Sequence, residues 1–171
     1  MSNDNTTLRA SPQVASKVIG GASAVALMIA LAVGTIRPWE GRELRAYRDI
    51  VGVWTICDGI TGPEARPGRV ATPAQCDTML ARDVATHANG LAACLTRPVP
   101  PEVMAAFVSF TFNVGVRGAC RSTAVAKLNR GDFRGGCNAL MSWVYAGGRQ
   151  VRGLVNRRNA ERTLCLRGVR T

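Results

Sequence analysis

The chain has 171 residues, a length that suits one domain with a single core and an added N-terminal segment, and that argues against two domains. Lys and Arg total 22 against 11 Asp and Glu, and the formal net charge of +11 favours polyanions: nucleic acid, anionic lipid or an acidic wall polymer. The arginines are scattered and no nucleic-acid motif is present, which disfavours nucleic acid and leaves a solvated basic surface as the neutral interpretation.

The first predicted element is an uncharged run of 19 residues, Val18 to Ile36, flanked by Lys17 and Arg37. At a rise of about 1.5 Å per residue, a helix of this length covers a hydrocarbon core of about 30 Å. Only nine of its residues are large and apolar, so insertion is weakly favourable and we expect a weak membrane anchor. A signal peptide cleaved near the Ala-Leu-Ala sequence at 30–32 and a buried core helix are the alternatives.

The rest of the chain predicts a small strand region followed by helices. A capping box at Thr72 and Gln75, with Pro73 at the first helical position, marks one helix start. In chain order we expect a short helix over 39–47, a hairpin-like strand region over 48–61, and helices over 72–93, after Pro101 through Phe107 and Phe110, from Ser122 or Thr123 to Gly131, from Asp132 to about Tyr145, and over 154–166. A hairpin lobe joined to a helical lobe gives an α+β fold with a cleft between them.

Six cysteines all follow the apolar run, an even number in the part of the chain that would be exported. Such a pattern favours disulfides in an oxidising compartment, periplasmic or extracellular. A zinc site is disfavoured because there is no Cys-x-x-Cys pair and the only histidine is His87, which we expect on a helix surface without a role. We therefore predict no metal and no cofactor. The cysteines are Cys57, Cys76, Cys94, Cys120, Cys137 and Cys165.

Three polar residues lie close together just after the apolar run: Glu40, Asp49 and Thr55. Most such triplets are ordinary surface residues. These three, however, fall between a predicted helix and a hairpin, so two elements can bring them together. In glycoside hydrolysis one carboxylic acid protonates the leaving oxygen while a second carboxylate orients water. The triplet thus predicts a candidate glycosidase site.

The motifs around the triplet resemble those of the phage lysozymes, the endolysins of glycoside hydrolase family 24. The similarity extends from about Glu40 to Gly168, and the order and spacing of the motifs carry it. The motifs are Trp39-Glu40-Gly41, Ala46-Tyr47-Arg48-Asp49, Gly52-Val53-Trp54-Thr55-Ile56, Phe112-Asn113-Val114-Gly115, Trp143-Val144-Tyr145-Ala146-Gly147-Gly148, Gly153-Leu154 and Arg157-Arg158.

This resemblance implies a lysozyme-like fold and a muralytic activity that cleaves, with inversion, the β-1,4 bond between N-acetylmuramic acid and N-acetylglucosamine of peptidoglycan. Glu40 would be the general acid, Asp49 would position or activate the attacking water, and Thr55 would help to hold that water. Substrate would be bound by Asn113, Gly115 and Tyr145, and the candidate partners of Glu40 are Arg157 and Arg158.

The resemblance also implies a disulfide pairing, and it has three departures, one of which is Glu43, at a position where many members carry arginine and to which we assign no catalytic role. The expected pairs are Cys57 with Cys76, Cys94 with Cys120, and Cys137 with Cys165. Cys57 stands where the family often has glycine, and Ile60 stands where it often has histidine, so any role of that histidine is absent here.

The weak N-terminal segment before such a domain resembles that of signal-arrest-release endolysins. We therefore expect residues 1–37 to tether an inactive form to the host inner membrane, with the catalytic domain, 38–171, in the periplasm, and release as a soluble monomer when the membrane is depolarised. Glu40 is only four positions after Ile36, so we expect tethering to displace the Glu40 helix. A disulfide-swap switch is disfavoured because the segment has no cysteine.

Two other functions remain open from the sequence. A lytic transglycosylase would use Glu40 alone and form a 1,6-anhydro sugar, whereas Asp49 and Thr55 favour hydrolysis. A non-enzymatic cationic protein would disrupt lipid directly with its basic body and apolar segment.

Overall fold

The computed structural model describes residues 18–169 of the chain. A small sheet precedes a larger set of helices, which confirms the α+β class predicted from the sequence. The helices are α2 (Ala22–Ile36), α3 (Pro73–Ala92), α4 (Pro101–Cys120), α5 (Thr123–Asn129), α6 (Phe133–Ala139) and α7 (Arg152–Arg167), with short 3-10 turns η1 (Arg37–Trp39), η2 (Gly62–Glu64) and η3 (Leu140–Ser142). The strands are β1 (Glu43–Arg48), β2 (Trp54–Cys57), β3 (Ile60–Thr61), β4 (Tyr145–Ala146) and β5 (Arg149–Gln150).

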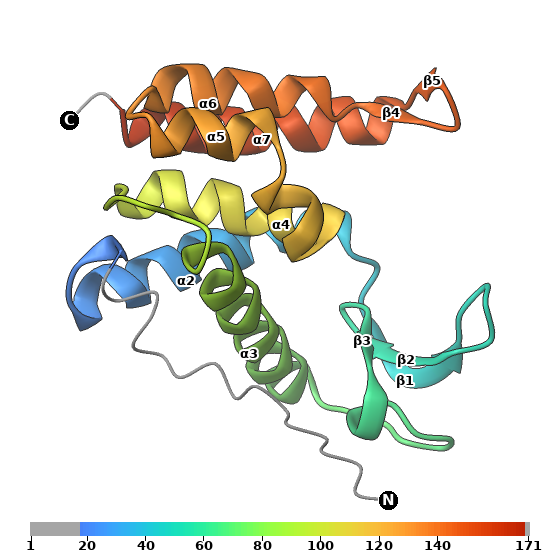
Figure 1. The fold of residues 1–171 in the computed structure, drawn as a ribbon. Helices are drawn as coiled ribbons and strands as arrows, with labels where there is room; N and C mark the ends of the chain where they lie inside the picture. The colour runs from blue at the N-terminus through green and yellow to red at the C-terminus, as the bar shows by residue number, and fades with distance from the viewer. Residues whose placement is uncertain (1–17, 170–171) are drawn as a thin grey trace, which may run out of the picture.

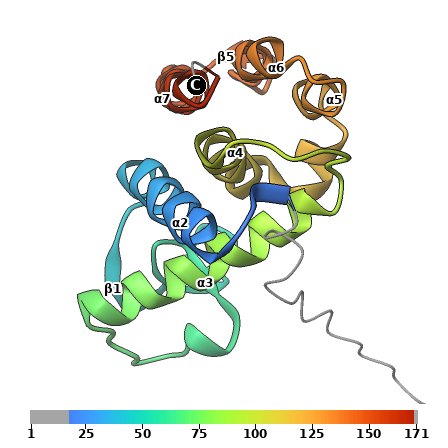
Figure 2. The ribbon, with the colours of Figure 1, turned by 90° about the vertical axis from the view of Figure 1, so that its left-hand side faces the viewer.

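The helical lobe is built around α4. This helix packs against α2 and α3 on one side and α7 on the other, and Figures 1 and 2 show α5, α6 and α7 as a layer across α4 from α2 and α3. Its apolar residues are almost all buried, among them Phe107 and Phe110 at the centre of the main core. The helical lobe therefore owes its cohesion to one central helix.

The β lobe is a three-stranded antiparallel sheet in the order β1-β2-β3. Thr55 pairs with Tyr47 on one side and with Thr61 on the other. A second, smaller core of Ala46, Ile56 and the start of α3 lies under the sheet. Helix α3 begins at this small core and extends into the helical lobe, so it connects the two lobes (Figure 1).

Helix α2 packs along the main core through three fully buried residues and the partly buried residues beside them. Met28, Ala32 and Ile36 are spaced four residues apart and are buried. Over Ala22–Trp39, a window long and apolar enough to cross a membrane, only 17% is buried, against 56% for Pro101–Cys120, the other such window in the described residues. Several further residues of α2 are only partly buried against the core, and Leu27 is exposed.

The predicted helix starts agree with the observed caps. Thr72 accepts a hydrogen bond from the backbone N–H of Gln75, and the Gln75 side chain accepts one from the N–H of Thr72, so the capping box is confirmed. Ser122 and Asp132 cap α5 and α6 through their side-chain oxygens. These local signals were readable because each requires only residues three apart.

Two predicted helices are wrong in extent. The region 39–47 is not a helix: only Arg37–Trp39 forms a 3-10 turn, and Glu43–Arg48 is a strand in which Leu44 and Ala46 face the small core. The predicted helix from Asp132 to Tyr145 ends at Ala139, because β4 and β5 form a hairpin whose turn is made by two glycines with positive φ. Pairing with distant segments overrides local helix propensity in the first region, and the glycine turn does so in the second.

Three disulfides tie neighbouring elements together, in the pairing expected from the resemblance. Cys57–Cys76 joins β2 to α3. Cys94–Cys120 joins the C-terminal ends of α3 and α4, and Cys137–Cys165 joins α6 to α7. Each closes a loop of 19, 26 or 28 residues, so each restricts the unfolded chain more than the folded one.

Candidate active site

Glu40 lies directly after η1, where the chain leaves the helical lobe for β1. Its side chain is 22% exposed, and its Oε1 accepts a hydrogen bond of 2.9 Å from Nη1 of Arg157 on α7. Of the two arginines expected as candidates, Arg157 therefore makes the ion pair with Glu40. Arg158 faces Asn113 instead, with 3.0 Å between its Nη2 and the amide oxygen.

Asp49 and Thr55 are brought together by the backbone of Val53. Oδ1 of Asp49 accepts hydrogen bonds from the N–H groups of Val51 (3.0 Å) and Val53 (2.8 Å). The Thr55 hydroxyl, which is 5% exposed, donates to the carbonyl oxygen of Val53 at 3.2 Å. The loop between β1 and β2 therefore fixes both side chains relative to the backbone of the same residue, Val53.

The turn between β2 and β3 approaches Glu40. A Cβ placed on Gly59 would lie 4.0 Å from Oε2 of Glu40, and Gly59 has a φ of +87°. Cys57, in the position where glycine is common in the resembling family, has a φ of +56° and is the single non-glycine residue with positive φ in the described part of the chain. A side chain at Gly59 would thus be disfavoured by its backbone and would reach toward the carboxylate.

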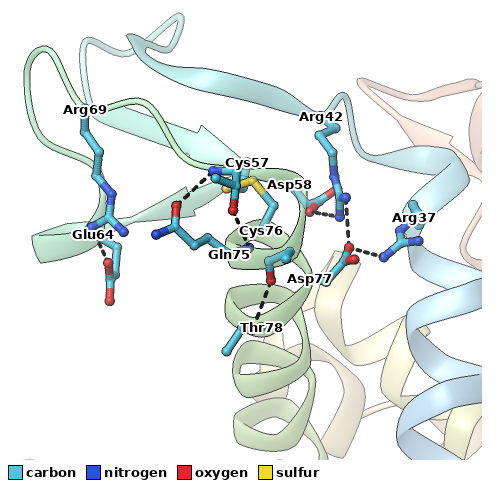
Figure 3. Close-up of a disulfide and its surroundings, with 12 residues drawn as sticks. Arg37, Arg42, Cys57, Asp58, Glu64, Arg69, Gln75, Cys76, Asp77 and Thr78 are labelled. Atoms are coloured by element: carbon cyan, nitrogen blue, oxygen red, sulfur yellow. Dashed lines mark hydrogen bonds and ion pairs between the residues drawn. A yellow bond between two sulfur atoms is a disulfide. The ribbon is translucent and has the colours of Figure 1, made fainter.

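Charged pairs hold this turn to the segment that carries Glu40. Arg42 binds the buried carboxylate of Asp58 through two nitrogens, at 3.1 and 2.7 Å, and also binds Asp77 at 2.8 Å. Arg37 makes a further ion pair with Asp77. Figure 3 shows these groups beside the Cys57–Cys76 disulfide, whose two cysteines directly precede Asp58 and Asp77.

The hydrogen bonds of this cluster favour its charged forms. The hydrogen bond from Arg42 lowers the pKa of the Asp77 carboxyl, and the positive charge of Arg37 acts in the same direction. The hydrogen bond to Asp58 raises the pKa of Arg42 against the opposing effect of burial. The chain on both sides of Glu40 is therefore held by permanent charges.

A cavity of about 270 Å³ opens between β3 and α3 beside this turn. Its lining is part polar and part apolar and includes Gly59, the glycine of the turn that approaches Glu40. The lining residues are Gly59, Ile60, Thr61, Glu64, Met79, Arg82, Asp83 and Thr86. A space of this size between the sheet and α3 can admit a group about as large as one sugar ring or a short peptide branch.

The three residues expected to bind substrate are placed differently. Asn113 is exposed near the kink of α4, where Gly115 adopts φ +77° and ψ 154° inside the helix. Tyr145 is 61% exposed on β4. The role of Tyr145 in binding stays a prediction.

His87 differs from its expected place on the surface. It is partly buried on α3, its ring lies 5.0 Å from that of Phe112, and its Nδ1 lies 2.9 Å from the carbonyl oxygen of Asp83. Burial alone would lower the pKa of His87, but the hydrogen bonds and charge of Asp83 outweigh it and raise the pKa. The histidine therefore contacts the residue next to Asn113.

A fully buried carboxylate that the sequence did not predict, Glu161, contacts both Arg157 and Arg158. Its position, four residues after one arginine and three after the other, was the available signal, because residues so spaced share a helix face. Arg42 and Asp58 were also missed. The two are 16 residues apart in sequence, one just before β1 and the other just after β2, so no local pattern connects them.

Known sequences are similar to this chain along most of its length. The phage lysozyme family model matches residues 37–161. The SAR-endolysin of bacteriophage PS119 is 38% identical over 155 residues, which cover 91% of this chain and 93% of the relative. That of Enterobacteria phage P21 is 39% identical over 155 residues, with 91% and 94% covered.

Solved structures share the fold. The muramidase domain of SpmX from Asticaccaulis excentricus has a TM-score of 0.72 and 27% identity, covering 79% of this chain and 94% of that domain. A mutant of P22 lysozyme has a TM-score of 0.72 and 26% identity, with the same coverage. With the family model matched from η1 to α7 and the fold shared as well, the chain belongs to the phage lysozyme family.

Proposed function

We propose that this protein is a muralytic endolysin that hydrolyses the β-1,4 bond between N-acetylmuramic acid and N-acetylglucosamine of peptidoglycan. The observation that carries the proposal is the partly buried Glu40 carboxyl, which is paired with Arg157 and approached by the β2–β3 turn at Gly59. Thr55 lies on β2 of the same sheet, and Asp49 lies in the loop before β2. Family membership supports the same activity, because the relatives are named as endolysins.

In this proposal the two carboxyl groups have separate tasks. Glu40 carries the proton and donates it to the oxygen of the leaving sugar. Asp49 orients the water: two backbone N–H groups donate to its Oδ1, and within the described residues its Oδ2 remains for a water molecule. Thr55 holds that water with its hydroxyl oxygen, which keeps its acceptor capacity while donating to Val53.

The test is Glu40→Gln in the full chain, with Glu43→Gln as the matched control. Glu43 is an exposed carboxylate three residues away on β1 and is outside the proposed machinery. We expect Glu40→Gln to lower the rate of peptidoglycan clearing by at least about 100-fold, since the proton donor is lost, and Glu43→Gln to keep the wild-type rate. An unchanged rate in folded Glu40→Gln, checked by circular dichroism, would contradict the proposal.

The products distinguish hydrolysis from the transglycosylase alternative. Hydrolysis with Asp49 as the water-orienting base gives products with reducing ends, whereas a transglycosylase gives 1,6-anhydro ends. We expect reducing ends, and we expect Asp49→Asn to lower their rate of formation by about 100-fold. Lysis by Glu40→Gln at the wild-type rate would instead favour direct disruption of lipid by a cationic protein.

We further propose that residues 1–37 tether an inactive form in the host inner membrane, with residues 38–171 in the periplasm, until α2 leaves the bilayer. Two observations support this: the apolar window Ala22–Trp39 is only 17% buried, and the relatives are named as SAR-endolysins. In the structure Ile36 is fully buried in the core four residues before Glu40. A helix held in lipid could not supply that contact, so Glu40 would be displaced.

Fractionation before and after collapse of the membrane potential tests the tether. We expect the full-length protein to move from the membrane to the soluble fraction as a monomer, together with wall-degrading activity. A shortened soluble product would mean a cleaved signal peptide, and activity in the membrane fraction before collapse would contradict the inactive tether.

A further inference from the structure

Beneath Glu40 lies a group of charged side chains that is almost entirely removed from water. Glu161 and Arg158 on α7 are 0% exposed, Arg157 is 5% exposed, and Ser109 on α4 is 0% exposed. They occupy the contact between α7 and α4, the central helix of the lobe. A buried group of this kind has to be matched internally, because no water shields its charges.

Glu161 is the centre of this group. Its Oε1 accepts hydrogen bonds from the Ser109 hydroxyl (2.7 Å), from Nη2 of Arg158 (3.1 Å) and, at 3.4 Å, from Nε of Arg157. Its Oε2 lies 2.7 Å from Nε of Arg158. One carboxylate therefore pairs with two guanidinium groups and orients both.

Each guanidinium extends from Glu161 to a different part of the proposed site. Nη1 of Arg157 reaches Glu40, the candidate proton donor, at 2.9 Å. Nη2 of Arg158 reaches the amide oxygen of Asn113, next to the α4 kink, at 3.0 Å. Glu161 is thus two contacts away from the general acid and from a residue expected to bind sugar, without touching either.

The arrangement is poorly suited to a purely stabilising role. Burial raises the pKa of Glu161 and lowers that of Arg158, since each charge loses hydration, and the charges of the partners only offset this cost. Buried ion pairs are often no more stabilising than apolar residues of similar volume, whereas a single unpaired buried charge is strongly destabilising. The geometry that the carboxylate imposes is a better explanation for its presence than the stability it adds.

We propose that Glu161 is a positioning residue for the reaction: it fixes Arg157 against Glu40 and Arg158 against Asn113, and so sets the general acid and the sugar-binding side of the cleft from one buried point. The inference rests on the proposed hydrolase function. Without Glu161, both guanidinium groups lose a fixed acceptor, and Glu40 and Asn113 lose partners of fixed position. Chemistry and substrate binding should therefore weaken together.

The test is Glu161→Gln in the full chain, which keeps the shape of the side chain and removes its charge. We expect kcat on peptidoglycan fragments to fall about 10- to 100-fold, as misplacement of a catalytic group does, and KM to rise. Leu164→Ala is the destabilised control: Leu164 is buried on the same helix outside the charged group, so this variant should lower Tm while kcat and KM stay at wild-type values below Tm.

Ser109→Ala provides a milder second variant if Glu161→Gln does not fold. It removes only the hydroxyl that binds Oε1, and leaves the Ser109 carbonyl oxygen that accepts from Arg157. We expect a change in kcat of about 2- to 10-fold in the same direction. Wild-type kcat and KM in whichever of the two variants folds, with or without a lower Tm, would overturn the proposal.

Wild-type protein and Glu40→Gln measured in the same assay separate the two failures. If the wild type does not cleave peptidoglycan, the proposed function is wrong. If the wild type is active, Glu40→Gln is inactive and Glu161→Gln equals the wild type, then only the positioning role is wrong.

Discussion

At the scale of single residues, the two carboxylates of the site are held by different means. Glu40 faces one full positive charge from a helix 117 residues away in sequence, whereas Asp49 is bound by neutral N–H groups of its own loop. The local arrangement around Asp49 forms from five neighbouring residues. The arrangement around Glu40 exists only when both lobes and α7 have assembled, so it depends on the whole fold.

His87 gives a prediction about pH. Burial opposes its protonation, but Asp83 raises its pKa above the ordinary value of about 6.5. Because the folded-state value is raised, the stabilisation is fully present below the unfolded pKa and is lost as pH rises through the folded one. We expect Asp83→Asn to lower the pKa of His87, measured by NMR titration. Urea unfolding at about pH 5.5 and about pH 8.5, on either side of the titration of His87, should show a smaller loss of stability in Asp83→Asn than in the wild type.

Asp77→Asn serves as the control, because Asp77 lies elsewhere on α3 and pairs with Arg37 and Arg42. It should leave the titration of His87 unchanged. An unchanged His87 titration in Asp83→Asn would contradict the assigned cause.

At the scale of elements, the kink of α4 gives a second prediction. Gly115 has φ +77° and ψ 154°, a conformation essentially restricted to glycine, and a Cβ there would meet no atom within 4 Å. Gly115→Ala should therefore cost about 1–3 kcal/mol of unfolding free energy through backbone strain alone. Chemical denaturation measures it.

Gly118 on the same helix is the matched control. Its added Cβ would make an ordinary contact with Val114, at 3.5 Å, so Gly118→Ala should be neutral or stabilising by up to about 1 kcal/mol. Equal effects of the two substitutions would show that the kink does not require glycine.

The elements also show what sequence could reveal. Caps at Thr72, Ser122 and Asp132 were readable because their hydrogen bonds span three residues. Strand β1 was not, since Ala46 and Arg45 are held by Arg69 and Val70 from a distant loop, and the pairing overrides the helical tendency of the segment. In the site, the motifs indicated Glu40, Asp49, Thr55 and the pair Arg157 and Arg158 as candidate partners of Glu40, but the burial that defines Glu161 is a property of packed helices.

At the scale of the whole molecule, α2 gives a third prediction. Ile36 is 0% exposed, whereas Leu27 on the same helix is 46% exposed. Ile36→Ala should lower the unfolding free energy by about 2–5 kcal/mol by leaving a cavity beside α4. Leu27→Ala should change it by less than about 0.5 kcal/mol.

Thermal and urea unfolding of the two variants give the comparison. Similar losses in both would mean that the apolar outer face of α2 is covered in solution. Activity of folded Ile36→Ala, measured below its Tm, would show in addition how strongly the end of α2 governs Glu40.

The sequence of α2 has to suit two environments, the lipid bilayer of the proposed tether and the protein core of the folded structure. Under the proposed tether, every position of the helix has to be acceptable to lipid, whereas the fully buried Met28, Ala32 and Ile36 and the partly buried residues that pack beside them have to fit a protein core. Small residues at the outer positions keep the free energy of insertion into lipid small and limit the apolar surface exposed to water. Selection on α2 should therefore constrain side-chain shape at the buried positions and average hydrophobicity at the other positions. Substitutions at the exposed positions should change the time of release, whereas substitutions at the buried positions should change the activity of the released enzyme.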